Sequence, residues 1–208
     1  MKGKVRVSRH PLVLEKIARL RDKSTGFGEF RSLMAEVSML LGYEALSEMK
    51  VKKAVVKTPL GPAHCLRAKQ DIIFTAILRA GLGMTEGLLR LEPSARLGHI
   101  GIYRNEETLD PVRYYVRLPN MRSRFVLLAD PMLATGGSAV EAVNILRSRG
   151  AAHITFLCLI AAKRGLDHFH KVHPDVPVYA GAVDGILNGN GYIVPGLGDA
   201  GDRIFGTI

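Results

Sequence analysis

From residue 71 to residue 182, short apolar runs alternate with amphipathic segments. The apolar runs are continuous rather than alternating with polar residues, which is typical of strands buried on both faces. The segments between them carry apolar residues at helical spacing. This alternation predicts an α/β fold with a parallel five-stranded sheet flanked by helices. Strands are expected at 71–78, 97–103, 125–129, 154–160 and 178–182, and helices near 84–91, 137–149 and 166–172.

The first 69 residues follow a different pattern. Apolar residues at helical spacing predict helices over 11–23 and 30–49. The turn-forming sequence Pro59-Leu60-Gly61-Pro62 separates two extended segments, 50–58 and 63–68, which predicts a hairpin. We expect a single domain in three parts: N-terminal helices and hairpin (1–69), a core (70–183) and a C-terminal loop that forms a small hood (184–208).

The composition is that of an ordinary globular protein, with 208 residues, 47% hydrophobic and 23% charged. The longest apolar run, 154–162, is far shorter than the roughly 20 residues that span a bilayer. No apolar signal core follows the charged N-terminus, so export is not expected. The two cysteines, Cys65 and Cys158, form no CxxC pair, so neither a disulfide framework nor a zinc site is indicated. A reducing cytoplasm is the expected location.

The positive charge is concentrated in the N-terminal third. The formal net charge is +10, and residues 1–69 hold 15 basic and 6 acidic residues, whereas residues 70–208 hold 14 and 13. A basic segment can bind nucleic acid, a membrane surface or phosphorylated ligands, or it can simply be solvated. Its few aromatic residues do not alternate with basic ones as a base-stacking surface requires. Charge alone therefore decides no function.

A strand followed by a glycine-rich turn forms the first candidate site. Residues 125–129 bring Asp130 to the end of a predicted strand, and small residues then lead into a helix. Backbone N–H groups of such a turn and the helix N-terminus suit a phosphate group, although the spacing is not that of a nucleoside-triphosphatase loop. An ordinary capped turn is the alternative. The candidate residues are Asp130, Pro131, Met132, Leu133, Ala134, Thr135, Gly136, Gly137 and Ser138.

Two arginines follow other predicted strands. Arg79 precedes a loop in which Gly81 and Gly83 allow close approach of the backbone, so its guanidinium could bind a diphosphate through two hydrogen bonds. Arg104 begins a charged segment, 104–115, which has the length and polarity of a lid. The alternatives are a surface arginine and a solvated loop.

The third candidate is the glycine-rich segment 190–203. Gly196, Gly198 and Gly201 formally match GxGxxG, but too few residues follow to complete a dinucleotide-binding unit. Apolar residues alternate with the glycines, which indicates a packed loop that could present backbone groups to a flat heterocycle. A poorly ordered C-terminal tail is the alternative. The three histidines His168, His170 and His173 lack metal-ligand spacing and are expected on a solvated helix face.

Taken together, the chain resembles the uracil phosphoribosyltransferase family, within the type I phosphoribosyltransferases. The order and spacing of four segments carry the resemblance, and the last is the most specific. They are Leu78 to Met84, Tyr103 to Thr108, Asp130 to Ser138, and Gly191 to Gly206 with Pro195-Gly196-Leu197-Gly198-Asp199-Ala200-Gly201-Asp202. The resemblance implies a sheet with a small hood and the transfer of a phosphoribosyl group from 5-phosphoribosyl 1-diphosphate to uracil, giving UMP and diphosphate.

The resemblance also implies roles for individual residues. Arg79 and Arg104 would bind the diphosphate, and the segment from Asp130 to Ser138 would bind the ribose and its 5-phosphate. Ile193, Gly198, Asp199 and Ala200 would hold uracil, and Asp199 would also lie near the donor. Many phosphoribosyltransferases have a second acid after the strand-end aspartate, where this chain has Pro131. Mg²⁺ is therefore expected to bind mainly through substrate oxygens and water, with no protein metal site.

The expected mechanism has an oxocarbenium-like transition state, with Arg79, Arg104 and Mg²⁺ stabilising charge on the departing diphosphate. Asp199 is the candidate for a general base. The family further implies GTP as an effector and a homodimer or larger homo-oligomer. Three other functions stay open: transfer to another base, an RNA-binding regulator that uses the basic N-terminal third, and a GTP-sensing module without turnover. The primary expectation involves no nucleic acid and no membrane.

Overall fold

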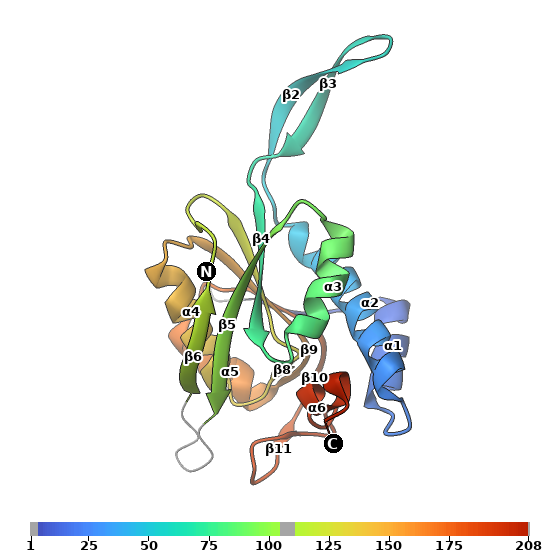
Figure 1. Cartoon of the computed structure of the whole chain (residues 1–208), viewed down its shortest axis with the longest axis vertical. Coiled ribbons are helices and arrows are strands. Elements are labelled where there is room, and N and C mark those ends of the chain that lie inside the picture. Colours follow the sequence, from blue (N-terminus) through green and yellow to red (C-terminus); the bar gives the residue numbers. More distant parts are fainter. Residues whose placement is uncertain (1–3, 105–110, 208) are drawn as a thin grey trace.

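A computed structural model describes residues 4–104 and 111–207, with the side chains of Arg104 and Pro111 left aside. Within these residues the central sheet has eight strands, and its path runs β1-β10-β9-β7-β4-β5-β6 with β8 paired to β9 (Figure 1). The five expected strands form its parallel centre, which confirms the predicted α/β class. They are β4 (Ile72–Leu78), β5 (Arg96–Arg104), β7 (Phe125–Ala129), β9 (His153–Ala162) and β10 (Val178–Asp184).

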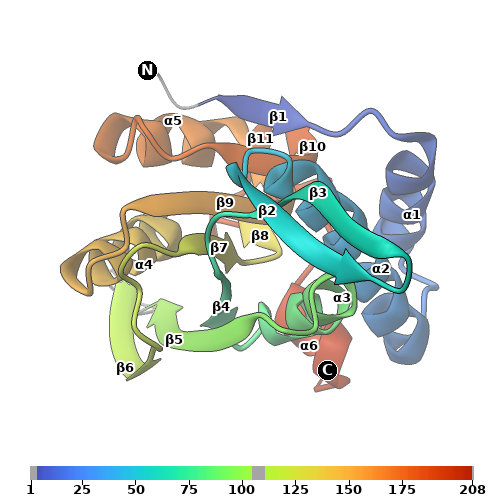
Figure 2. The same cartoon turned by 90° about the horizontal axis from the view of Figure 1, so that it is seen from above.

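Helices cover both faces of the sheet because alternate strand residues point into two separate cores. On β4, Phe74 belongs to one core, whereas Ile73 and Ile77 belong to the other. In Figure 2, α1 (Pro11–Arg21), α2 (Phe27–Leu46) and α3 (Leu82–Leu91) lie on one side of the sheet, and residues of these helices belong to the first core. Residues of α4 (Gly137–Ser148) and α5 (Lys163–Val172), on the other side, belong to the second core. Burial on both faces explains the continuous apolar runs.

The predicted hairpin is present and projects away from the sheet. Its strands, β2 (Val51–Thr58) and β3 (Gly61–Ala68), pair with each other in a two-stranded sheet whose last pair is Thr58 with Gly61. Most of its residues are exposed. Figure 1 places it at the end of the molecule opposite to α6 (Ala200–Phe205) and β11 (Ile186–Leu187).

Several elements go beyond the expected pattern. The sheet gains β1 (Val5–Val7) at one edge, β6 (Pro111–Arg117) at the other, and the short β8 (Met132–Leu133). β6 runs antiparallel to β5, so the last five residues of the expected lid, 111–115, are paired strand. The lid residues 105–110 lie outside the described residues, and closure of this segment stays a prediction. β11 and β12 (Ile193–Val194) pair with each other near α6.

The expectation of a solvated face was wrong for His173, which is 2% exposed. Its ring packs against Phe169 and lies between α5 and α4. Arg147 Nη1 lies 3.2 Å from Nδ1, and Nε2 lies 3.2 Å from the carbonyl oxygen of Val140. Because Arg147 can only donate, Nδ1 accepts and Nε2 donates. Burial lowers the pKa of His173, which favours this neutral ring.

None of the described helices is long and apolar enough to cross a membrane. The helices instead pack closely on one another, most closely where α3 meets α2. A Cβ atom on Gly87 would lie only 1.8 Å from the carbonyl oxygen of Ala35, so this crossing requires glycine. By contrast, a Cβ atom on Gly28, in the first turn of α2, would meet nothing within 4 Å.

We therefore expect Gly87→Ala to destabilise the fold by about 3 kcal/mol, because the two helices must move apart. Gly28→Ala is the matched control and should be neutral or stabilising by about 0.5–1 kcal/mol, since alanine favours the helix. Urea unfolding of both variants measures these free energies. Equal stabilities of the two variants would contradict the close packing of α2 and α3.

Candidate active site

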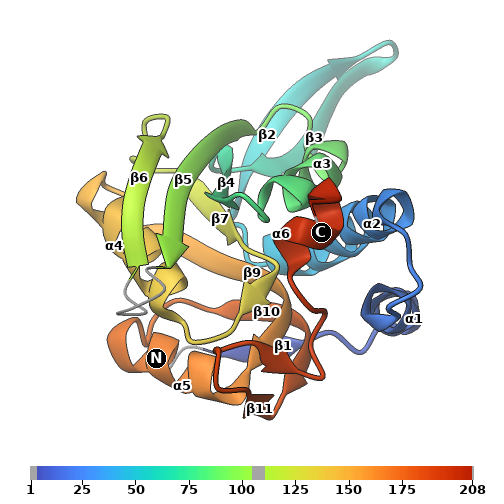
Figure 3. The same ribbon diagram turned by 60° about the horizontal axis from the view of Figure 1, so that its bottom comes forward.

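A cavity of about 840 Å³ lies at the carboxyl edge of the sheet, where the chain leaves β4 and β7. Figure 3 brings this edge forward, with α6 and β11 beside it. Ligands of open α/β sheets bind at this edge. The lining residues come from the turn after β4, the turn after β7 and two parts of the C-terminal loop. They are Ala80, Asp130, Pro131, Met132, Ala134, Ser138, Gly189, Asn190, Gly191, Tyr192, Ile193, Gly198, Asp199, Ala200 and Gly201.

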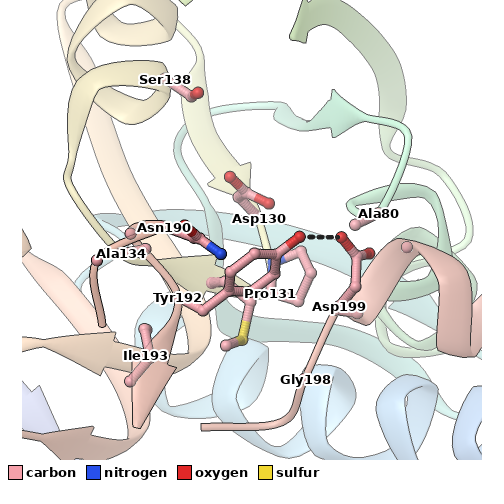
Figure 4. Close-up of a pocket in the computed structure, with 15 residues that line it drawn as sticks. Ala80, Asp130, Pro131, Ala134, Ser138, Asn190, Tyr192, Ile193, Gly198 and Asp199 are labelled. Carbon is pink, nitrogen blue, oxygen red and sulfur yellow. Dashed lines mark hydrogen bonds between the residues drawn. The ribbon is translucent and has the colours of Figure 1, made fainter. Parts of the chain in front are cut away.

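Asp130 lies at the centre of the cavity (Figure 4). Its backbone N–H continues the pairing of β7 with β9 by donating to Leu157 O at 3.1 Å, so the sheet fixes its position. Its side chain is partly buried, and desolvation raises the pKa of the carboxyl to about 7, against the opposite effect of a hydrogen bond from the Met132 N–H. The carboxyl can thus change protonation near neutral pH.

The turn after Asp130 is shaped for an anion. Gly136 has φ +87°, and α4 begins at the next residue with no side chain capping its N-terminus. A Cβ atom on Gly136 would lie 2.8 Å from Gly165 O, so both the backbone angle and the space require glycine. Ser138 faces the cavity. Free N–H groups of a helix N-terminus beside a hydroxyl can bind a phosphate group.

The residues of the segment 130–138, predicted to bind the ribose and its phosphate, have different positions in the structure. Pro131, Met132, Ala134 and Ser138 line the cavity, as Asp130 does. Leu133 is 1% exposed and belongs to the second core, so its side chain faces away from the cavity. Thr135, Gly136 and Gly137 form the turn itself and offer backbone groups.

The first turn of α5 packs against the turn after Asp130, which we call the cradle. The sequence did not indicate this contact. A Cβ atom on Gly165 would lie 2.2 Å from Ala134 O and 2.7 Å from Leu133 O, so backbone packs directly on backbone. His168 Nδ1 lies 2.9 Å from Thr135 O and donates a hydrogen bond to it. These contacts hold the cradle without using its inward-facing groups.

Arg79 lies beside the cavity rather than on its lining. Its side chain is 59% exposed, and Nη2 lies 3.6 Å from Asp202 Oδ1. The guanidinium also lies 5.7 Å from the ring centre of Phe205. The adjacent Ala80 lines the cavity, and the peptide bond before Arg79 is cis. Since an exposed ion pair is weak, Arg79 can turn toward a bound anion.

Arg104 is the last residue of β5, which runs parallel to β4. Its backbone therefore reaches the same edge of the sheet as Arg79. Its side chain lies outside what the structure describes, so the predicted role of Arg104 is carried by its position at the strand end alone.

The C-terminal loop forms the other wall of the cavity. Ile193, Gly198, Asp199 and Ala200, the four residues expected to hold a heterocycle, all line it. Asp199 caps α6: Oδ1 accepts a hydrogen bond from the Asp202 N–H at 3.0 Å. Its other oxygen, Oδ2, lies 3.4 Å from the hydroxyl of Tyr192 (Figure 4). Asp199 therefore has a structural role, and Oδ2 is the oxygen directed toward the cavity.

The lining residues that precede Ile193 include three of the candidate segment 190–203 to which the sequence analysis gave no individual role. Tyr192 projects into the cavity beside Asn190, and glycines flank them. The available signal was an aromatic residue within the asparagine- and glycine-rich stretch 188–192, where a side chain of that size is not needed for a turn. Among the described residues, no group of three or more His, Cys, Asp or Glu side chains could hold a metal ion.

Comparison with known proteins places these features in one family. The sequence pattern of the family "Uracil phosphoribosyltransferase" matches residues 7–207. The chain is 52% identical to the uracil phosphoribosyltransferase of Shouchella clausii and 50% identical to that of Clostridium perfringens, over 99% of each chain.

Solved structures agree with this fold. The AQ2163 protein of Aquifex aeolicus superposes with a TM-score of 0.93 at 37% identity, over 97% of both chains. A hypoxanthine-guanine phosphoribosyltransferase of Bacillus anthracis superposes with a TM-score of 0.52 at 11% identity, over 76% of this chain and 80% of that one. The second likeness concerns the fold alone.

The raised pKa of Asp130 predicts how stability depends on pH. Between the usual aspartate pKa of 3.8 and about 7, the folded protein retains a proton that the unfolded chain has lost, so stability falls as the pH rises through this window. Asp130→Asn removes this effect. We expect its melting temperature, relative to the unchanged protein, to be higher at pH 8 than at pH 5. The same difference at both pH values would show that burial does not raise this pKa.

Proposed function

The chain belongs to the uracil phosphoribosyltransferase family, and we propose that its cavity carries out the transfer of a phosphoribosyl group from 5-phosphoribosyl 1-diphosphate to uracil. The products are UMP and diphosphate, so the protein is a pentosyltransferase. The observation that carries the proposal is a single cavity that joins a strand-end acid and an anion-binding turn to the C-terminal loop. The acid and the anion-binding turn suit a sugar-phosphate donor, and the C-terminal loop suits a flat base.

The donor occupies the half formed after β7. Its 5-phosphate binds the N–H groups of the turn from Thr135 to Ser138, at the N-terminus of α4. The ribose hydroxyls donate hydrogen bonds to ionised Asp130, and Arg79 and Arg104 bind the diphosphate. Because the 5-phosphate is remote from the bond that breaks, its binding energy serves to position the anomeric carbon.

Uracil occupies the half formed by the C-terminal loop. Ile193 supplies an apolar contact, and the backbone from Gly198 to Ala200 supplies donors and acceptors that match a flat ring. Gly198 has φ +72°, which turns its peptide groups in a direction that residues with side chains rarely adopt.

In the reaction, uracil N1 forms a bond to the anomeric carbon, and the bond from that carbon to the diphosphate oxygen breaks. Positive charge on the sugar and negative charge on the diphosphate both grow in the transition state. Arg79 and Arg104 stabilise the leaving group. The N1 proton passes to Asp199 Oδ2 or to water, and Asp199 Oδ2 already faces the hydroxyl of Tyr192.

The donor chemistry suits Mg²⁺, which prefers carboxylate and phosphate oxygens. Asp130 and Asp199 are the two carboxyl groups on the cavity lining, too few for a protein metal cage, so the ion would be held mainly through the substrate diphosphate and water. When bound, Mg²⁺ neutralises charge on the departing diphosphate.

Other properties implied by the family stay predictions: activation by GTP, a cytoplasmic location, and a homodimer or larger homo-oligomer. The projecting hairpin supports assembly, because Val51, Val55 and Leu66 expose apolar surface on it. Both cysteines are free, as a reducing compartment allows. Sedimentation equilibrium of the chain tests the assembly.

Transfer to another base uses the same donor half, so only the C-terminal loop separates it from the proposed reaction. An RNA-binding regulator would instead use the basic N-terminal third, whose hairpin lies at the opposite end of the molecule from α6 and β11. A GTP-sensing module would form no product. No described feature favours these functions.

The purified chain, given uracil, the labelled donor and Mg²⁺, should form UMP and diphosphate. Cytosine, hypoxanthine and guanine in place of uracil should give at least about 100-fold lower kcat/KM, because unmatched hydrogen-bonding groups would be buried against the loop. Chromatography of the labelled product measures this, with and without GTP. Product from another base but none from uracil would assign the loop a different substrate, and no product from any base would reject transferase activity.

Arg79→Ala should lower kcat/KM for the donor by about 10²–10³, because a charge that stabilises the leaving group is removed. Its melting temperature should hardly change, since the side chain is exposed. Arg90→Ala is the matched control: it removes an exposed arginine paired to Glu86 on the helix that follows Arg79. Near-normal donor kinetics for Arg79→Ala would exclude Arg79 from the diphosphate site.

A further inference from the structure

An ion pair outside the cavity grips the C-terminal loop at one peptide unit. Arg21, the last residue of α1, donates two hydrogen bonds to Asp184, the last residue of β10, at 2.7 and 2.8 Å. Asp184 Oδ2 also accepts the N–H of Gly196 at 2.9 Å. Arg21 Nη1 in turn donates to Gly196 O at 3.1 Å. Both polar groups of Gly196 are thus bound by the pair.

The pair is well shielded from solvent, with Asp184 9% and Arg21 24% exposed at their side chains. The hydrogen bonds from Arg21 lower the pKa of Asp184, so the carboxyl is charged at neutral pH. A bidentate arginine–carboxylate pair has fixed geometry, in contrast to a surface ion pair. It therefore presents one donor and one acceptor to Gly196 in a fixed arrangement.

A second arginine fixes the next residue of the loop. Arg203 Nη1 donates to Leu197 O at 2.9 Å and to Leu20 O at 2.5 Å, and Nη2 donates to Asp22 O at 2.7 Å. Its guanidinium lies 4.2 Å from the ring centre of Phe30. The carbonyl groups at the end of α1 and the loop are therefore linked through one side chain.

The gripped residues stand between the two cavity-lining parts of the loop. Ile193 precedes Gly196 by three residues, and Gly198 follows it by two. Gly196 itself has φ +54°, and a Cβ atom there would lie 2.2 Å from Ile193 O, so the turn is tight. A shift of the Gly196 peptide is therefore passed directly to Ile193 and Gly198.

We propose that Arg21 and Asp184 are positioning residues for the nucleobase, which act by holding the Gly196 peptide and thereby the uracil-binding face of the loop. The inference rests on the proposed function for the identity of the base. Neither residue lines the cavity, and both act through the backbone. Peptide groups that bind a flat ring must be positioned accurately. Each group is part of the backbone, so it cannot adjust without moving its neighbours.

A second arginine–aspartate pair in the chain serves as a control for this ion pair. Arg147 Nη2 donates to both oxygens of Asp175, at 2.6 and 2.7 Å, and joins α4 to the segment before β10. In this pair one nitrogen serves both oxygens, the side chains are more exposed (38% for Arg147 and 63% for Asp175), and the arginine reaches His173 rather than the C-terminal loop. Its loss therefore shows what removing an arginine–aspartate pair that does not contact the loop does to the enzyme.

The first test compares Arg21→Met with Arg147→Met. Arg21→Met should raise KM for uracil about 10–100-fold, while KM for the donor changes less than about 2-fold, because only the base half is misplaced. Arg147→Met should leave both values near those of the unchanged enzyme. Equal rises of both KM values, or an unchanged KM for uracil in folded Arg21→Met, would overturn the proposal. If Arg21→Met does not fold, the isosteric Asp184→Asn takes its place, with the same expectations.

A charge swap separates stability from positioning. In the double variant Arg21→Asp with Asp184→Arg, the ion pair can form again, but the Gly196 N–H then faces a guanidinium and its carbonyl faces a carboxylate. The melting temperature should recover relative to the single variants, whereas KM for uracil should stay raised. Arg21→Lys keeps a donor and should recover part of the uracil affinity. Recovery of normal uracil KM in the swapped enzyme would reduce the pair to a structural link.

A measurement that does not depend on turnover distinguishes failure of the positioning role from failure of the proposed function. Amide hydrogen exchange of the segment 193–200 in the ligand-free protein should be faster in Arg21→Met than in Arg147→Met. Unchanged exchange would overturn the positioning role even in an active enzyme. Failure of the unchanged protein to form UMP would instead overturn the proposed function, while faster exchange in Arg21→Met would still show that the pair holds the loop.

Discussion

Close contact between backbone segments at the carboxyl edge of the sheet is the constraint on which the cavity depends. A Cβ atom would lie 2.7 Å from Ala129 O if placed on Gly81, and 2.2 Å from Ala134 O if placed on Gly165. The turn after β4 therefore packs directly against the end of β7, and the first turn of α5 packs directly against the anion-binding turn. Such packing sets the place of Asp130 before any ligand binds, and a preformed site loses little energy to reorganisation.

The two halves of the cavity are held by different forces. The anion-binding half rests on strand pairing and backbone packing, whereas the base half rests on arginine side chains. Arg21, Arg31 and Arg203 donate to the carbonyl oxygens of Gly196, Ile204 and Leu197, respectively. A loop with only two paired residues at β12 must find other partners for its backbone groups, and long side chains reach them. The base half can consequently be altered by substitutions outside the cavity.

The sequence was sufficient for the parallel centre of the sheet because burial on both faces leaves continuous apolar runs. It was insufficient at the edges: β6 has Arg113, Tyr114 and Tyr115 exposed, so its composition resembles a polar loop. The turns that carry the candidate residues could be predicted because turn chemistry is local, and the structure places most of these residues on the cavity lining. The link from Arg21 to Asp184 joins residues 163 positions apart, and no short motif announces a pairing at that separation.

Asp130 follows β7 and Asp184 ends β10, two parallel strands that lie on either side of β9, yet their pKa values shift in opposite directions. Hydrogen bonds from Arg21 outweigh the burial of Asp184, which stabilises its charged form and the fold together. For Asp130, burial outweighs the hydrogen bond from Met132, so ionisation near neutral pH opposes folding. The hydrogen bonding that the fold provides does not offset the cost of ionising Asp130, but a bound ligand can provide further hydrogen bonds. The contrast supports the proposed roles, in which Asp184 holds the loop and Asp130 binds the substrate.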